Sequence, residues 1–259
     1  MKGVLYIGHG TRVKEGNEQV KSLAEKVKDQ VPVPVQETAF LELAAPTIPE
    51  GVKRCVAQGV TELYVVPVLL FSARHLHDDI PAELSRAQHV HPELTIQLGD
   101  ALGIRESLLQ IVSDHLTEAG ILQDSGASRL VLVGRGSSEE AVVSQVKEIT
   151  EILKNRHQFN NAATCFLAAA NPPFQETMHQ SARQEEETVY VVPYLLFTGL
   201  LMQEIHQVVQ NVQHKHLHKT FKVCPHLGAK EALEEVIVEH TKAIVQTTSS
   251  NQTGKPIFS

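Results

Sequence analysis

Residues 63–80 read LYVVPVLLFSARHLHDDI, and residues 189–206 read VYVVPYLLFTGLLMQEIH, the same pattern 126 positions later. Two further pairs of segments match at this spacing: YIGHGT (6–11) with LVGRGS (132–137), and AFLELAAPTIPE (39–50) with CFLAAANPPFQE (165–176). Self-similarity at a fixed offset is the signature of a duplicated fold. The sequence therefore predicts two copies of one structural unit.

The repeat divides the chain into three parts. We expect an N-terminal α/β domain at 1–124, a second α/β domain at 125–246 and a polar tail at 247–259. The tail is rich in Ser and Thr and is expected to be a loose end.

Each copy alternates short apolar runs with the periodicity of surface helices. Runs such as LYVVPVLL are apolar on both faces, which is typical of parallel strands covered by helices on both sides. The predicted class is α/β, with two tandem doubly wound parallel-sheet units and a ligand cleft between the carboxyl ends of their strands. For the first copy we expect strands near 3–8, 33–40, 60–67 and 94–98, and helices near 15–29, 46–58, 78–90 and 104–119.

Composition narrows the class of protein. The 259 residues carry a net charge of −7 with a pI near 6.0, which argues against a nucleic-acid binder. The cysteines Cys55, Cys165 and Cys224 are far apart, as in proteins of the reducing cytosol. The N-terminal apolar run is too short for a signal peptide, and no run is long enough to cross a membrane. We expect a cytoplasmic protein without nucleic-acid or membrane partners.

The two copies differ at polar positions near the ends of predicted strands. Residues that one copy alone keeps stand out against the shared scaffold, and three such pairs occur at the offset of 126: His9 with Arg135, Glu42 with Ala168, and His75 with Leu201. Ligands bind beyond the carboxyl ends of parallel strands. The three polar residues of the first copy are therefore candidates for a functional site.

Two histidines and a glutamate suit a divalent first-row metal such as iron, cobalt, nickel or zinc. The neutral imidazole is the form that coordinates, and it is common at pH 7. Gly8 and Gly10 flank His9 and permit a tight turn that a planar ligand can approach closely. A single histidine at a strand end is more often structural, but three polar residues confined to one copy favour a metal site.

The segments LYIGHGTR, FLELAAPTIPEG and VVPVLLFSARHLHDDIP resemble the class II chelatases that insert metal into tetrapyrroles, in particular the sirohydrochlorin ferrochelatase and cobaltochelatase branch. The resemblance spans nearly the whole chain as two repeats. It implies a monomer of two fused α/β domains, insertion of Fe²⁺ into sirohydrochlorin with release of two protons, and no cofactor besides the substrate metal. Cobalt-specific long relatives often carry a histidine-rich stretch or a cysteine cluster near the C-terminus, and the absence of both here favours iron over Co²⁺ or Ni²⁺.

The resemblance also assigns residues. His9, His75 and Glu42 match the active-site positions, where they would bind metal and accept protons. Because sirohydrochlorin carries several carboxylates and the chain is acidic, local cations must meet them. Arg135 occupies the position of His9 in the second copy and is the stronger candidate; Arg12 and Arg74 stand beside the predicted catalytic residues but could equally be solvated loop residues.

Three other functions remain open at this point. The first is a sirohydrochlorin cobaltochelatase. The second is a non-catalytic carrier of metal or tetrapyrrole that uses the same residues. The third is a histidine phosphatase, whose nucleophilic histidine also follows a first strand; Gly8 stands where that family has arginine, which disfavours it.

Overall fold

The computed structural model describes residues 1–121 and 127–250, apart from the side chains of His75 and of residues 247–250. The chain forms two compact units. The first unit consists of Met1–Gly103 with the chain from Glu231 onward, and the second unit of Ile104–Lys230.

The first unit is built on a parallel sheet of four strands in the order β2-β1-β3-β4. The central strand β1 begins with Lys2 and then buries every residue, and Val4 to Ile7 are fully buried. The strands are β1 (Lys2–Gly8), β2 (Val35–Phe40), β3 (Glu62–Pro67) and β4 (Thr95–Leu98), and the helical segments are α1 (Lys14–Val27), the 3-10 helix η1 (Lys28–Gln30), α2 (Ile48–Ala57), the π-helix η2 (His75–Asp79), α3 (Ile80–Val90) and α8 (Ala232–Ser250).

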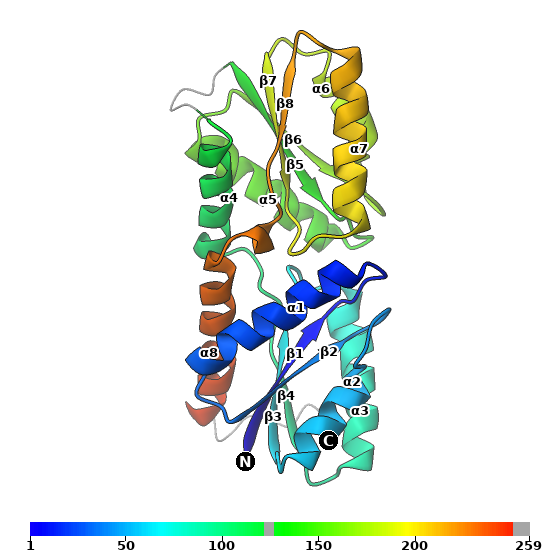
Figure 1. Ribbon diagram of the computed structural model, residues 1–259, viewed down its shortest axis with the longest axis vertical. Coiled ribbons are helices and arrows are strands. Elements are labelled where there is room, and N and C mark those ends of the chain that lie inside the picture. Colours follow the sequence, from blue (N-terminus) through cyan, green and yellow to red (C-terminus); the bar gives the residue numbers. More distant parts are fainter. Residues whose placement is uncertain (122–126, 251–259) are drawn as a thin grey trace. The chain divides into compact units, whose positions relative to one another are not determined.

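Helices cover both faces of this sheet. In Figure 1, α2 and α3 lie on one side of the first unit, where Val52 and Ile80 pack with Leu5 and Ile7 in one apolar core. On the other side α8 contacts both β3 and α1. A strand covered on both faces buries side chains of either parity, which explains the unbroken apolar runs of the sequence.

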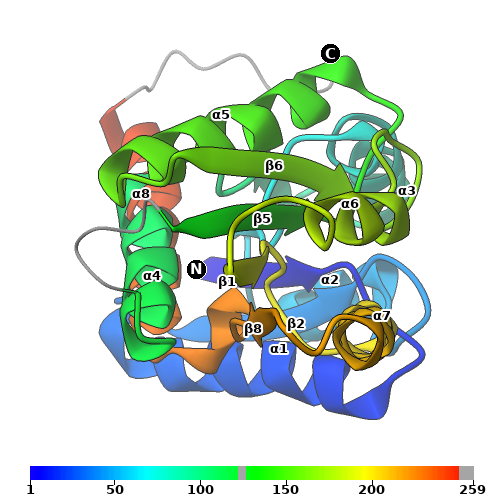
Figure 2. The same cartoon turned by 90° about the horizontal axis from the view of Figure 1, so that it is seen from above.

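The second unit repeats this sheet in the order β6-β5-β7-β8, again with parallel pairing. Helix α5 runs beside β5 and β6 (Figure 2), and α6 and α7 close the opposite core. The elements are α4 (Glu106–Glu118), β5 (Ser128–Gly134), α5 (Glu140–Arg156), β6 (Asn161–Phe166), α6 (Phe174–Ser181), β7 (Thr188–Pro193), α7 (Leu200–Lys215), β8 (Thr220–Val223) and the 3-10 helix η3 (Leu227–Ala229). The predicted α/β class with two parallel sheets is confirmed.

The compact units do not coincide with the sequence copies expected at 1–124 and 125–246. Helix α4 ends the first copy but belongs to the second unit, where it contacts α5 and η3. Helix α8 ends the second copy but belongs to the first unit. The chain therefore exchanges its two terminal helices between the units.

The C-terminal region also differs from expectation in its first residues. Helix α8 continues to Ser250, so residues 247–250 of the expected polar tail are helical, and residues 251–259 lie outside the described part. None of the helices in the described ranges has both the length and the hydropathy of a membrane span.

Candidate metal centre at the end of the first sheet

The chain order places a topological switch point between β1 and β3, because β2 and β3 flank β1 on opposite sides. In open parallel sheets, ligands bind outside the carboxyl ends of the strands at such a point. His9 directly follows β1, and Glu42 follows β2 by two residues. The positions expected from sequence thus lie at the edge of the sheet where a ligand is expected.

Backbone contacts hold these two residues together. The amide of Leu41 donates to the carbonyl of Gly8 over 3.0 Å, and the amide of Glu42 donates to that of His9 over 3.0 Å. Gly10 has φ +91°, and a Cβ atom there would lie 1.8 Å from the carbonyl oxygen of Glu42. Only glycine permits both the left-handed conformation and this approach. The pairing of β1 with β2 therefore extends beyond the strands.

The side chains of His9 and Glu42 meet as a consequence. Nδ1 of His9 lies 3.5 Å from Oε1 of Glu42 and 3.2 Å from the carbonyl oxygen of Gly10. Two acceptors facing Nδ1 favour the tautomer with the proton on that nitrogen, which leaves the lone pair on Nε2. The two side chains are 25% and 46% exposed, so the pair is accessible to a ligand.

The third predicted residue, His75, begins the π-helix η2, and its side chain lies outside the described residues. The corresponding residues of the second copy, 201–205, lie within the regular helix α7. Single π-helical turns occur frequently at functional sites. Among the side chains that the structure describes, no group of three potential ligands gathers in one place.

The predicted arginines are all exposed. Nε of Arg74 lies 3.6 Å from Oδ2 of Asp78, an exposed ion pair that adds little stability. Arg12 stands in a loop closed by Asn17, whose side chain accepts from the amide of Thr11 over 2.9 Å and donates to its carbonyl over 2.7 Å.

Arg135 follows β5 as His9 follows β1. Its carbonyl accepts from the amide of Ala168 over 2.9 Å, and Gly136 has φ +98° with a would-be Cβ 1.7 Å from the Ala168 carbonyl oxygen. The second copy therefore keeps the backbone of the site while its side chains differ.

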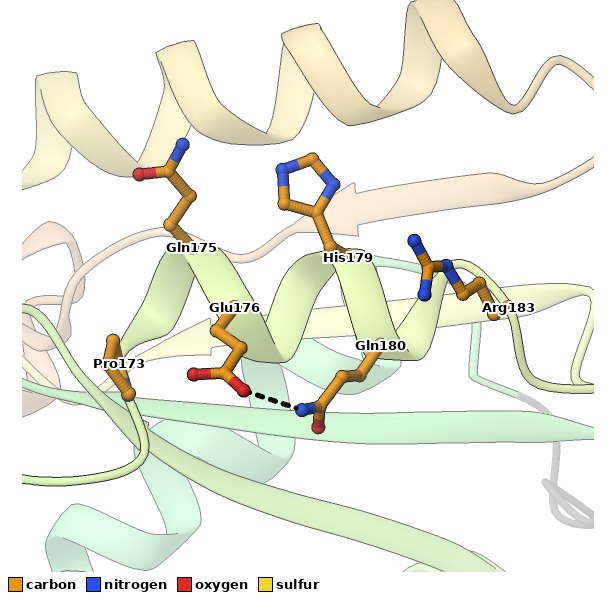
Figure 3. A pocket seen from close by; sticks show the side chains of 6 residues that line it. All are labelled: Pro173, Gln175, Glu176, His179, Gln180 and Arg183. Atoms are coloured by element: carbon orange, nitrogen blue, oxygen red, sulfur yellow. Dashed lines mark hydrogen bonds between the residues drawn. The ribbon is translucent and has the colours of Figure 1, made fainter.

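A hollow of about 620 Å³ lies in the second unit (Figure 3), and none of the residues predicted from the sequence to form the site lines it. Its lining comes from α6 and the residues at its two ends: Pro173, Gln175, Glu176, His179, Gln180 and Arg183. Gln180 donates to Glu176 over 3.0 Å, while Gln175 and His179 project from another side of the helix. One short helix and the residues next to it thus supply the lining of this hollow.

Leu43, which directly follows Glu42, is not among the residues predicted from the sequence. Leu43 has φ +58° and is 54% exposed, both unusual for leucine. The signal was available in the repeat, because Ala169 stands at the equivalent position in the second copy.

A family model, proteins of known activity and solved structures each match most of the chain. The family model CbiX matches residues 3–119 and again residues 129–244. A sirohydrochlorin ferrochelatase of Priestia megaterium is 36% identical over 247 residues, 95% of this chain and 92% of that protein. A sirohydrochlorin cobaltochelatase of the same organism is 28% identical over 244 residues, 93% of this chain and 79% of that protein. The solved structure of SirB from Bacillus subtilis with Fe³⁺ has a TM-score of 0.86 and 33% identity, and the match covers 100% of this chain and 99% of that one.

Proposed function

The chain belongs to the CbiX family, and from that premise we propose that it is a sirohydrochlorin ferrochelatase, a lyase that inserts Fe²⁺ into sirohydrochlorin. The reaction replaces two pyrrole N–H protons by one divalent cation and yields sirohaem and two protons. The observation that carries the proposal is the His9–Glu42 pair beyond the carboxyl ends of β1 and β2, in a chain whose 36% identical relative bears this activity.

His9 supplies the first ligand for the incoming iron. With the proton on Nδ1, the lone pair of Nε2 is directed to the metal, and the carboxylate of Glu42 orients the ring as outer-shell carboxylates commonly do. A metal that must be transferred needs an incompletely coordinated site. We assign His75 as the second imidazole, on the basis of its place after β3 and its absence from the second copy.

Glu42 has a second role in this proposal. Its 46% exposed carboxylate can accept a pyrrole proton, directly or through one water. Glu42 thus acts on both sides of the reaction: it fixes the tautomer of His9, which binds the metal, and it accepts a proton from the ring. Through this one carboxylate, arrival of the metal is coupled to deprotonation of the ring.

The carboxylates of the substrate require cations. We assign this role to Arg135, which is exposed directly after β5, with Arg12 and Arg74 as further contacts. Gly8 and Gly10 let the ring approach the backbone closely. The opening of α5 just beyond Arg135 adds the favourable end of a helix dipole for an anion.

The proposal also covers the oligomeric state, the location and the cofactors of the enzyme. The enzyme acts as a monomer, because one chain holds both copies, and it works in the cytoplasm, as its free, buried cysteines suggest. It needs no cofactor beyond the substrate metal, and Co²⁺ or Ni²⁺ are alternative metals.

The test is an anaerobic reaction of the protein with Fe²⁺ and excess sirohydrochlorin, followed by absorbance. Many sirohaem molecules formed per protein establish the enzyme, and a spectral change that stops at one equivalent identifies a carrier. Parallel reactions with Co²⁺ and Ni²⁺ decide the metal: faster turnover with Co²⁺ than with Fe²⁺ at matched concentrations would make the protein a cobaltochelatase.

A further inference from the structure

Leu43 is a large apolar residue in an exposed and conformationally costly position. Its φ of +58° lies in the left-handed region, where a Cβ atom is disfavoured, and its side chain is 54% exposed. Folding alone would favour glycine or a polar residue at such a place. Neither cost is offset by burial.

The left-handed backbone belongs to the scaffold of the repeat. Ala169 in the second copy has φ +52° and lies in a loop with the same hydrogen bonds to its own strand ends. The leucine side chain belongs to the first copy alone. Leu43 therefore follows the same rule as His9 and Glu42, which the first copy also carries alone.

The loop that carries Leu43 is fixed at both ends. On one side the amide of Glu42 donates to His9, and on the other the amide of Phe40 donates to the carbonyl of Pro46 over 2.8 Å. The carboxylate of Glu50 then accepts from the amide of Thr47 over 2.7 Å and fixes the start of α2. A loop held in this way keeps the exposed side chain of Leu43 in a fixed conformation, one residue after Glu42.

We propose that Leu43 contacts an apolar face of the tetrapyrrole ring and positions it over His9 and Glu42. The inference rests on the proposed function, since it needs a flat, largely apolar ring to be drawn to this edge of the sheet. Burial of the leucine against the ring removes apolar surface of both partners from water, which favours binding of the ring. The leucine contacts neither the metal nor the pyrrole protons in this arrangement, so its effect is on binding of the ring.

The experiment measures binding and turnover separately for full-length variants. Leu43→Ala removes the contact and reproduces the residue of the second copy. Leu43→Gly removes the contact and also relieves the left-handed backbone, whereas Leu43→Met keeps a large apolar side chain. Val90→Ala is the matched control, because Val90 is 72% exposed in the same unit but ends α3, near the opposite edge of the sheet.

Leu43→Ala and Leu43→Gly are expected to raise the Kd for metal-free sirohydrochlorin, measured by its fluorescence, and its KM by about 10-fold or more. The KM for Fe²⁺ and kcat stay within about twofold, Leu43→Met recovers most of the loss, and the Tm of Leu43→Gly equals or exceeds that of the parent. A merely structural role would move Tm and leave Kd unchanged.

Equal Kd and KM values for Leu43→Ala, Leu43→Gly and Val90→Ala would overturn the inference while leaving the enzyme assignment intact. If the parent binds sirohydrochlorin without multiple turnover, the proposed activity fails and the Kd values still decide the role of Leu43. A parent protein that binds no sirohydrochlorin refutes both.

Discussion

Nδ1 of His9 lies 3.5 Å from Oε1 of Glu42, and the two residues are joined through the backbone as well, by the hydrogen bond from the amide of Glu42 to the carbonyl of His9. The second copy repeats the backbone bond between Ala168 and Arg135 but has no carboxylate or imidazole there. The duplicated loop is thus a common support on which the first copy alone carries a histidine and a carboxylate.

Replacing His9 by alanine should abolish iron insertion, with a loss of at least about 100-fold in kcat/KM, because it removes the imidazole that we propose as the first metal ligand. The circular dichroism spectrum should not change, since His9 is partly exposed and its backbone bonds remain. His89→Ala, on the exposed face of α3, is the control and should keep full activity. Near-normal turnover of His9→Ala would reject the assignment.

Glu42→Gln separates the charge of the carboxylate from its shape. The amide oxygen can still accept from Nδ1 of His9, so the tautomer is preserved, but the group no longer takes up a proton. We expect kcat to fall about 10- to 100-fold while the Kd for sirohydrochlorin changes little. Glu18→Gln, an exposed carboxylate of α1, is the matched control. An unchanged kcat would show that Glu42 neither accepts the proton nor needs its charge.

Charge reversal at Arg135 tests binding of the substrate carboxylates. Arg135→Glu should raise the KM for sirohydrochlorin about 10-fold or more, because a charge-assisted hydrogen bond is lost and a repulsion is gained. The KM for Fe²⁺ should remain as it was. Arg183→Glu, an exposed residue of the same unit at the hollow on α6, serves as control. Equal effects of both reversals would indicate general electrostatics in place of a specific contact.

The stability of the second unit should depend on pH through His115. This residue is 2% exposed, and its Nε2 has no hydrogen-bond partner in the described structure. Burial, followed by the positive charge of Lys230, lowers the pKa of His115 below its usual value of 6.5. The unfolded chain then binds the proton more readily, so the stabilisation is complete above about pH 6.5 and is lost as the pH falls below it.

Unfolding by denaturant at several pH values between 7.5 and 5.5 measures this effect, and hydrogen exchange of the β5 amides reports on the second unit. The free energy of unfolding of the second unit should fall on acidification by at most about 1.4 kcal/mol per pH unit for this group. His115→Leu should flatten the dependence. A slope unchanged by that substitution would locate the pH sensitivity elsewhere.

Because the terminal helices are exchanged, a substitution in the last helix of one sequence copy should destabilise the unit that contains the sheet of the other copy. Ile237 is fully buried on α8, which contacts β3 and α1. Ile237→Ala should cost about 2–5 kcal/mol and lower the protection of amides in β1 and β3, although Ile237 belongs to the second sequence copy. Leu116→Ala on α4 is the reciprocal variant and should lower the protection of amides in the second unit, where α4 contacts α5 and η3. The opposite assignment of effects would contradict the exchange.

The strands and most helices could be predicted because their local pattern is unambiguous. Strands expected near 3–8 and 60–67 are found at Lys2–Gly8 and Glu62–Pro67, since a strand buried on both faces reads as a continuous apolar run. The region expected as a helix from 78 begins earlier, with the π-helix at His75–Asp79. The pattern of hydrophobic residues does not distinguish a π-turn from an α-turn, because both bury one side of the segment.

The sequence by itself determined the duplication, the parallel α/β architecture and the polar residues that only one copy carries, because these depend on local periodicity and on comparison within the chain. The tertiary structure alone decided that His9 and Glu42 come into contact, that Leu43 is left exposed and that α4 and α8 change units. Contacts between residues distant in sequence depend on strand register and loop closure, and two helices of equivalent pattern fit either sheet. Their final places are therefore set by the folded chain as a whole.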